Sequence, residues 1–269
     1  MNDLRRVSID VPVRESEVVR ARLLPLAPDG FEEVERGTRL ELAVYVDEAG
    51  ERRLREAFGD VSASPVAPGW EDSWRSFHRG VVAGGLWLGP PWERPPDGVA
   101  AVCVDPGRAF GTGAHPTTRA CVELLADLER GSCLDAGCGS GVVAVAATRL
   151  GFRPVLAVDS DPAAVEAATK TARRNGVEIE VLERDVLREE LPRTDLVVAN
   201  IELAVVEALL ARCSARAVLT SGYLSGQVPA APGWQRTVRL ELEGWAADVF
   251  SAARALRSPA GATAAVGAH

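Results

Sequence analysis

The sequence predicts an α/β protein with a doubly wound, seven-stranded, mostly parallel sheet, preceded by a small α+β domain. Three patterns support this prediction. From Ala100 onward, short apolar segments alternate with amphipathic segments of helical length. The first 65 residues follow a different order: strand, helix, strand, strand, helix and strand. Near the C-terminus, two strand-like segments joined by Glu243-Gly244 suit an antiparallel hairpin at the edge of the sheet.

The small domain is expected over residues 1–65. Apolar residues alternate over 7–11 as in a half-buried strand, and residues 18–23 have helical spacing. Residues 31–35 and 40–46 are two further strand candidates. This order fits a split βαβ unit.

Residues 66–99 are expected to form a linker rich in Trp and Pro. They contain Trp70, Trp74, Trp87 and Trp92 without a sustained helical or strand period. Four tryptophans must bury large apolar surfaces, so the linker should pack against one or both domains. A role facing the substrate is the alternative.

The large domain is expected over residues 100–257, followed by a disordered Ala- and Gly-rich tail over 258–269. Its strand candidates are 132–135, 155–159, 179–183, 195–200, 217–221, 237–242 and 245–253. Its helix candidates are 119–128, 142–150, 162–175 and 203–213.

Composition and charge limit the functional classes. Hydrophobic residues make up 47% of the chain and charged residues 25%, as in globular proteins. The net charge of -8 argues against a direct grip on nucleic acid, which needs clustered Lys and Arg. No apolar run approaches the roughly 20 residues of a membrane helix, and no secretory signal is recognisable. We expect a cytoplasmic monomer without a membrane contact.

The five cysteines have neither metal-ligand spacing nor a disulfide-like pattern. They are expected to be reduced thiols, and we expect no metal site.

A glycine-rich loop follows the first strand of the large domain. The strand ends at Asp135, and Gly137, Gly139 and Gly141 precede the next helix. Such glycines let a ligand approach the backbone closely. A dinucleotide fingerprint would require Gly where Val142 stands, which disfavours a nicotinamide cofactor. A cationic sulfonium ligand with an amino-acid tail explains Asp135 better, because a carboxylate supports its ammonium group. Hydrogen bonding to the loop backbone is the alternative.

Three further acids follow the next two strands. Asp159 ends the second strand, where an acid accepts hydrogen bonds from a ribose diol. Asp161 precedes Pro162 and is expected to cap the following helix. Asp185, after the third strand, is either a reader of an adenine amino group or a turn residue.

Asn200 ends the fourth strand, where its carbonyl oxygen can orient a substrate amine. Capping the next helix is the alternative. Upstream, residues 105–118 are dense in Gly, Pro and Thr and should form a structured loop, with Thr117 or Thr118 as a helix cap. His115 in this loop is expected to be a structural hydrogen-bonding residue, with a catalytic base as the alternative.

Taken together, these motifs resemble the methyltransferases that modify large-subunit ribosomal protein L-eleven. The resemblance runs from about residue 70 to residue 250, and Phe110 to Thr118 is its most specific part. The matching motifs, in order, are Trp74-Arg75, Leu86-Trp87-Leu88, Pro90-Pro91-Trp92, Asp105 to Thr118, Asp135 to Gly141, Asp159 to Pro162, Asn175-Gly176-Val177 and Ala199-Asn200-Ile201.

This resemblance implies a ferredoxin-like N-terminal domain that recognises the ribosomal protein. It also implies a catalytic domain that transfers methyl groups from S-adenosylmethionine to Lys side chains and the N-terminal amine. The family's cofactor contacts fall on Thr118, Gly137, Asp159 and Asn200. Asn200 is also our candidate for the catalytic residue that orients the amine.

Three alternatives remain open. A methyltransferase of the same fold can act on another protein or on a small molecule. A nicotinamide oxidoreductase is disfavoured by Val142. A non-catalytic binding module is disfavoured because candidates are present at both the cofactor and the amine positions.

Overall fold

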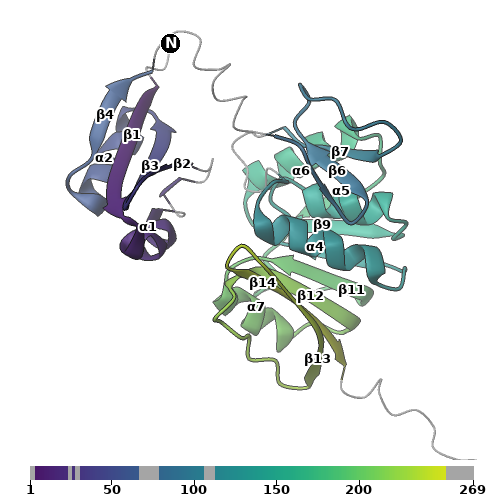
Figure 1. Ribbon diagram of the computed structural model, residues 1–269. Helices are drawn as coiled ribbons and strands as arrows, with labels where there is room; N and C mark the ends of the chain where they lie inside the picture. The colour runs from purple at the N-terminus through teal and green to yellow at the C-terminus, as the bar shows by residue number, and fades with distance from the viewer. Residues whose placement is uncertain (1–3, 24–25, 28–30, 67–78, 106–112, 253–269) are drawn as a thin grey trace, which may run out of the picture.

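The computed structural model of the chain describes residues 4–23, 26–27, 31–66, 79–105 and 113–252. These residues form sheets of four, seven and three strands. Figure 1 shows the four-stranded sheet with its helices as a body distinct from the two other sheets. Within these ranges no helix combines the length and the apolar character needed to cross a membrane.

The N-terminal domain has the order βαββαβ and an antiparallel sheet in the order β2-β3-β1-β4. This ferredoxin-like arrangement confirms the prediction for the small domain. A short 3-10 turn, Val13–Glu15, links the first strand to the first helix. The elements are β1 (Arg5–Pro12), α1 (Ser16–Leu23), β2 (Glu32–Arg36), β3 (Arg39–Val46), α2 (Glu48–Phe58) and β4 (Ser62–Pro65).

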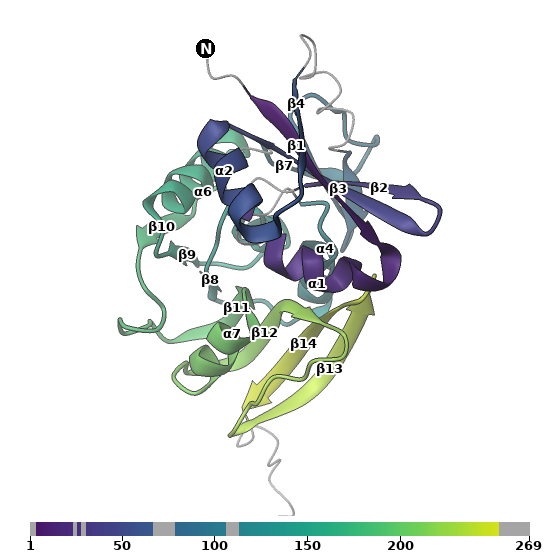
Figure 2. The same ribbon diagram turned by 90° about the vertical axis from the view of Figure 1, so that its left-hand side faces the viewer.

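The core of this domain lies between the sheet and its two helices. Val7 of β1 and Leu42 of β3 are fully buried, and they pack in one cluster with Leu23 of α1 and Leu54 of α2. Figure 2 shows both helices on the same side of the sheet. The period-two alternation predicted for β1 therefore reflects one face packed on helices and one face that is polar.

The three-stranded sheet corrects the predicted linker. It consists of β5 (Val81–Ala83), β6 (Leu86–Gly89) and β7 (Ala100–Cys103). Gly84 and Gly85 join β5 to β6, and both have positive φ, as a two-residue hairpin turn requires. Strands of three and four residues are too short to show a period, which is why the sequence suggested only a linker.

Trp87 accounts for part of the tryptophan-rich composition of this segment. Its indole is buried against Gly80 and Gly89, where an added Cβ would lie within 2.3 Å of the ring. Trp87 is therefore a packing residue. Packing was the first of the two roles that we predicted for the tryptophans of the linker. Trp70 and Trp74 lie outside the described residues.

The seven-stranded sheet confirms the predicted doubly wound fold. Its order is β10-β9-β8-β11-β12-β14-β13, in which β14 pairs antiparallel with both of its neighbours and all the other pairs are parallel. Figure 1 shows the closing hairpin of β13 and β14 in yellow-green at one edge. The strands are β8 (Cys133–Ala136), β9 (Val155–Asp159), β10 (Glu180–Glu183), β11 (Thr194–Asn200), β12 (Ala215–Leu224), β13 (Trp234–Leu242) and β14 (Trp245–Ala252).

Helices cover both faces of this sheet. One core cluster joins the sheet to α4 (Pro116–Asp127), α5 (Val142–Arg149) and α6 (Pro162–Arg174), and it also includes the three-stranded sheet. The other cluster joins the opposite face to α7 (Leu203–Leu210). Strands buried on both faces read as continuous apolar runs, which is the pattern that the sequence shows.

Two helix starts test the predicted caps. Asp161 caps α6 as predicted: its side chain accepts a hydrogen bond from the amide of Ala163. The predicted cap of α4 is wrong. His115 is the N-cap and its ring accepts from the amide of Thr117, while Thr117 and Thr118 lie inside the first turn. Pro116 occupies the first helical position, and this places the cap one residue before it.

The strand order places the functional edge of the sheet. The chain enters the sheet at β8, runs outward through β9 and β10, and returns to β11 on the other side of β8. Ligands of open α/β sheets bind at the carboxyl ends of the strands beside such a reversal. Ala136, Asp159 and Asn200 are the last residues of β8, β9 and β11.

Asn175 joins β7 to α6. Its Oδ1 accepts a hydrogen bond from the Cys103 amide at 2.7 Å, and its Nδ2 donates to the Cys103 carbonyl oxygen at 2.7 Å. Nδ2 also donates to the carbonyl oxygen of Thr171 at 2.8 Å. The side chain thus replaces a strand partner at the end of β7, where the chain turns toward the loop before α4.

We predict that Asn175→Ala lowers the free energy of unfolding by about 1–3 kcal/mol, because it leaves both backbone groups of Cys103 without a partner. Chemical denaturation measures this change. Arg174→Ala is the matched control: it removes the partly exposed ion pair with Asp105, 3.1 Å long, which contributes less than about 1 kcal/mol. Equal losses in the two variants would contradict the bridging role of Asn175.

Candidate active site

The glycine-rich loop lies at the carboxyl ends of β8 and β9. Gly137, Gly139 and Gly141 all have positive φ, of 76°, 51° and 77°. The amides of Gly137 and Cys138 both donate to the carbonyl oxygen of Val158, at 2.8 and 2.9 Å. The loop therefore bends from β8 across the end of β9 before α5 begins.

Gly141 allows α5 and α6 to approach closely. It is the left-handed N-cap residue of α5, and an added Cβ would lie 2.9 Å from the Cα and Cβ of Ala168. The next residue, Val142, is buried in the core. Close helix packing is thus achieved at position 141, and the position where a dinucleotide fingerprint would need glycine is filled by a core side chain.

Asp159 lies directly beside this loop. Its Oδ2 accepts a hydrogen bond from the Gly139 amide at 2.9 Å, and its Oδ1 accepts from the Asp161 amide at 3.0 Å. The side chain is only partly buried. A carboxylate has about four acceptor positions, so two remain for the hydroxyl groups of a ligand. The structure brings together two residues that the sequence singled out separately.

Asp135 is buried and contacts the start of α5. It is 2% exposed, and its Oδ2 accepts a hydrogen bond from the amide of Ala144 in the first turn of α5 at 3.0 Å. Burial raises the pKa of Asp135 to about 7; the hydrogen bond from Ala144 opposes this shift and the charge of Asp159 adds to it. The contact with backbone that the sequence offered as an alternative is present, although it is made to the helix.

Asn200 meets Thr118 across the site. Its Nδ2 lies 3.5 Å from Oγ1 of Thr118, which is fully buried in the first turn of α4. Asn200 Oδ1 is buried and has no hydrogen-bond partner among the residues that the structure describes. A buried carbonyl oxygen without a partner costs free energy unless a ligand donates to it. The alternative role of Asn200 as a helix cap is wrong, because Glu202 is the N-cap residue of α7.

Ile201 is held between two glycines. An added Cβ on Gly137 would lie 2.5 Å from Cγ2 of Ile201, and one on Gly222 would lie 2.2 Å from its carbonyl oxygen. The amide of Ile201 donates to the carbonyl oxygen of Ser221 at 3.1 Å. The ends of β8, β11 and β12 therefore meet tightly next to Asn200.

His115 is a structural residue at the start of α4. Besides capping the helix, its ring lies 4.9 Å from that of Trp245 in a T-shaped contact. Burial lowers the pKa of His115 to about 4, with a smaller opposing effect of the Glu243 charge. The imidazole is neutral at physiological pH and accepts the cap hydrogen bonds, which supports the structural interpretation over a catalytic base.

Asp185 takes the turn role that the sequence left open. Its Oδ1 accepts from the amide of Leu187, and its Oδ2 pairs with Arg188 at 3.2 Å.

In the loop before α4, residues 106–112 lie outside the described residues, so the most specific part of the resemblance is described only from Gly113 to Thr118.

Sequence reasoning assigned no role to three neighbours of the site: Ile201, which it quoted only within a motif, Gly222 and Trp245. Gly222 alone left a signal, since a glycine inside a strand pattern indicates a bulge or a close approach of backbone. Ile201 and Trp245 are ordinary apolar residues whose contacts depend on strand order.

The chain matches a known protein family. The family model described as Ribosomal protein L11 methyltransferase (PrmA) matches residues 48–228, more than half of the chain. The chain belongs to this family. The predicted resemblance is confirmed, although the match begins earlier and ends earlier than the predicted range.

Individual relatives agree with the family. The ribosomal protein L11 methyltransferase of Pelotomaculum thermopropionicum is 43% identical over 162 residues, which cover 58% of this chain and 52% of that protein. The enzyme of the same name from Marinobacter nauticus is 38% identical over 167 residues, covering 60% and 56%. The chain thus spans about half the length of the curated relatives it matches.

A solved structure supports the fold. The ribosomal protein L11 methylase of Lactobacillus delbrueckii subsp. bulgaricus is 27% identical, with a TM-score of 0.59. The similarity covers 65% of this chain and 99% of that one. The α/β fold of the family is therefore present in this chain.

The raised pKa of Asp135 predicts a dependence of stability on pH. The pKa of an unfolded Asp is about 3.9, so between about pH 4 and 7 the folded chain holds more protons at this residue, and its stabilising contribution is lost as the pH rises. Asp135→Asn removes this effect. Between about pH 4 and 7, we expect the free energy of unfolding of Asp135→Asn, measured relative to that of the parent, to rise by about 1.4 kcal/mol per pH unit.

Denaturation of parent and variant at several pH values measures this difference. Asp195→Asn is a control for the sign, because hydrogen bonds from Ser132 lower the pKa of Asp195. The stability of Asp195→Asn relative to the parent should fall as the pH rises toward the unfolded pKa of about 3.9, and it should stay level above that pH. Parallel curves for Asp135→Asn and the parent would contradict the assignment for Asp135.

Proposed function

We propose that this chain is an S-adenosylmethionine-dependent protein methyltransferase that modifies Lys side-chain and N-terminal amines of ribosomal protein L11. The observation that carries the proposal is the buried Oδ1 of Asn200 at the carboxyl edge of the sheet, which has no hydrogen-bond partner within the described part of the chain. Membership of the family supports the reaction class. The names of the relatives support the substrate.

The residues present fit the proposed cofactor. The loop carries no side chain at Gly137 and Gly139, and Asp159 beside it retains acceptor positions for a ribose diol. Thr118 and Asn200 are in contact with each other, and Asn200 precedes Ile201, which lies against Gly137 of the loop. S-adenosylmethionine, when bound, supplies an electrophilic methyl group on its sulfonium sulfur.

Asp135 has a different part in this proposal. Because it is buried and bonded to Ala144, we place it behind the loop, where its charge and not a direct contact supports the ammonium group of the cofactor. A nearby cation favours the ionised form of a carboxyl. Cofactor binding should therefore lower the pKa of Asp135.

The chain's own contribution to methyl transfer is chiefly orientation. Asn200 Oδ1 accepts a hydrogen bond from the amine N–H, which directs the nitrogen lone pair at the methyl group. The amine must be neutral, and the reference pKa of a Lys side chain is about 10.4. Removal from water lowers that pKa and favours the nucleophilic form. The neutral His115 is not needed as a base.

The match to the family model does not cover the first part of the N-terminal domain, so we consider two classes of substrate. The family model begins at residue 48, so β1, α1, β2 and β3 of the N-terminal domain lie outside it. We assign this domain to recognition of the ribosomal protein. The alternative is a class I methyltransferase of the same reaction type that acts on another protein or a small molecule.

We predict that two single substitutions separate orientation from cofactor binding. Asn200→Ala should lower the rate of methyl incorporation roughly 100-fold, as misplacement of a reacting group does, and keep measurable cofactor binding. Asp159→Ala should weaken S-adenosylmethionine binding, because it removes the acceptor for the ribose. Labelled cofactor, purified ribosomal protein L11 and calorimetry measure both effects, and mass spectrometry maps the modified amines.

Asp161→Ala is the matched control. It removes a helix-capping carboxylate two residues from Asp159 and should cost about 1 kcal/mol of stability without changing the affinity for the cofactor. Full turnover in Asn200→Ala would exclude Asn200 from the mechanism. Cofactor binding by the parent without incorporation into L11 would leave the enzyme class standing and exclude the proposed substrate.

A further inference from the structure

A β-bulge interrupts β12 next to the proposed site. Ser221 pairs with Ala247 of β14, and the next pair is Tyr223 with Ala246, so Gly222 is the extra residue. Gly222 has φ of 99° and its Cα lies against the backbone of Ile201. Bulges occur often next to active sites, where they redirect a side chain or end the strand pairing. The neighbour here is the residue that follows Asn200.

Tyr223 closes the bulge on itself. Its side chain is 2% exposed, and its hydroxyl oxygen lies 2.7 Å from Oγ1 of Thr220, three residues earlier in the same strand. The hydroxyl also lies 2.9 Å from Oδ2 of Asp248, the residue paired with Thr220 on β14. Burial raises the pKa of Tyr223, so the phenol keeps its proton and can donate.

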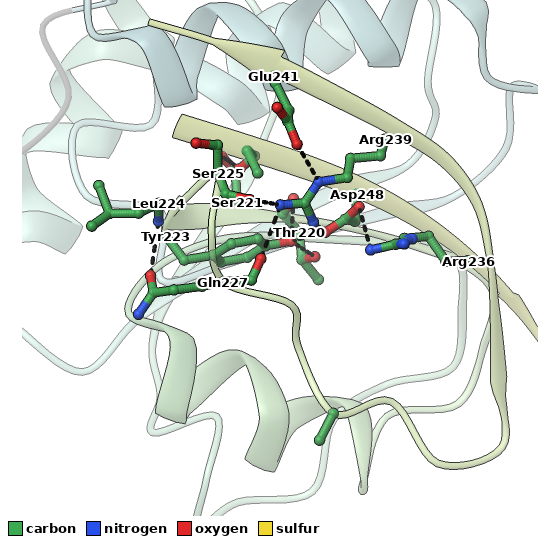
Figure 3. Close-up of polar contacts among 12 residues, drawn as sticks. Thr220, Ser221, Tyr223, Leu224, Ser225, Gln227, Arg236, Arg239, Glu241 and Asp248 are labelled. Carbon is green, nitrogen blue, oxygen red and sulfur yellow. Dashed lines mark hydrogen bonds and ion pairs between the residues drawn. The ribbon is translucent and has the colours of Figure 1, made fainter. Parts of the chain in front are cut away.

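Asp248 extends this contact to the edge strand. It is fully buried, and its Oδ2 accepts from Nη1 of Arg239 on β13 at 2.8 Å. Arg236 lies 3.6 Å from the other carboxylate oxygen. Figure 3 shows the hydroxyl, the carboxylate and the two guanidinium groups converging from β12, β14 and β13.

Arg239 also holds the chain that leaves β12. Its Nη2 donates to the carbonyl oxygens of Ser225 and Gln227, at 2.5 and 2.9 Å. The amide of Leu224 donates to Oε1 of Gln227 at 2.8 Å (Figure 3). The network therefore fixes the bulge from one side and the loop that follows it from the other.

Stability alone does not account for such a network. Removing charges from water is costly, and a buried ion pair is often no better than apolar packing of similar volume. In some proteins buried polar groups fix the register of the elements that carry them. The register that these contacts fix directly is that of β12 against β14, where Gly222 is the extra residue.

We propose that Tyr223 and Asp248 are positioning residues for methyl transfer, which hold the Gly222 bulge against Ile201 and so fix the carboxamide of Asn200. This inference rests on the proposed function. It adds residues that touch neither cofactor nor amine and that act only through Asn200. We call the hydrogen-bonded group of Thr220, Tyr223 and Asp248 the clamp. Its loss should lower the rate of methyl transfer and leave the affinity for the cofactor unchanged.

A double-mutant cycle on the full chain tests this inference. Tyr223→Phe removes only the hydroxyl, and it should lower kcat for L11 methylation about 10- to 100-fold with an unchanged Kd for S-adenosylmethionine. The double variant Tyr223→Phe/Asn200→Ala should be no slower than Asn200→Ala alone, because residues that act as a unit are not additive. Losses that multiply in the double variant, or an unchanged kcat in Tyr223→Phe, would overturn the inference.

A measurement without turnover keeps the test independent of the substrate. The side-chain amide signal of Asn200 in a nitrogen-15 correlation spectrum, identified by its absence in Asn200→Ala, should shift or broaden in Tyr223→Phe. Thr220→Val, which removes the other hydroxyl, should reproduce the shift. Thr237→Val on β13 is the control, since it removes a hydroxyl that donates to Val249 at 3.1 Å, outside the clamp.

The two readouts separate the two proposals. An Asn200 signal that moves while the parent methylates nothing would exclude the proposed function and retain the clamp. A signal unchanged in both Tyr223→Phe and Thr220→Val, or moved equally in Thr237→Val, would overturn the clamp whatever the enzyme does.

Discussion

The close approach of three strand ends at the carboxyl edge of the sheet is the constraint on which the site depends. Gly137 after β8 and Gly222 in β12 both contact Ile201, the residue after β11. A side chain at either glycine would collide with Ile201, and both glycines have positive φ. The chain thus tolerates no Cβ at two points so that Asn200, the last residue of β11, lies beside the glycine-rich loop.

Two buried aspartates show how differently the fold treats charge near this edge. Asp135 lies behind the loop with one backbone donor in α5, and burial raises its pKa to about 7. Asp248 is equally buried, but a phenol and two guanidinium groups surround it. The first residue can respond to a nearby cation. The second is held by hydrogen bonds from Tyr223 and Arg239 to its Oδ2, whereas its Oδ1 has no hydrogen-bond partner among the described residues.

Most of the fold was predictable from the sequence because its signals are local. Apolar segments of strand length mark β8 to β12, and Asp161-Pro162 marks the start of α6. The misses arise where the signal is short or distant. The strands β5 and β6 have too few residues to show a period, and the cap of α4 is a histidine, which is rarely used for this purpose.

The features of the site likewise divide into those with a local sequence signal and those that depend on contacts between distant segments. Gly137, Asp159 and Asn200 were recognisable because each follows directly from a strand end. The meeting of Thr118 with Asn200, and the clamp around Gly222, depend on which strands are neighbours, and local patterns do not report that. The sequence singled out Asp135 as a site residue. It did not indicate that the Asp135 carboxylate accepts a hydrogen bond from α5, because that contact depends on the direction of the side chain.

The central claim is that Asn200 Oδ1 faces the reacting amine. A crystal structure with a cofactor analogue, in which a carbon bearing an amino group replaces the methylsulfonium centre, tests it most directly. We expect the amino nitrogen at hydrogen-bond distance from Asn200 Oδ1, about 2.7–3.2 Å, with the ribose hydroxyls on Asp159. An analogue bound with its amino group turned away from Asn200, or bound away from the glycine-rich loop, would contradict this role of Asn200.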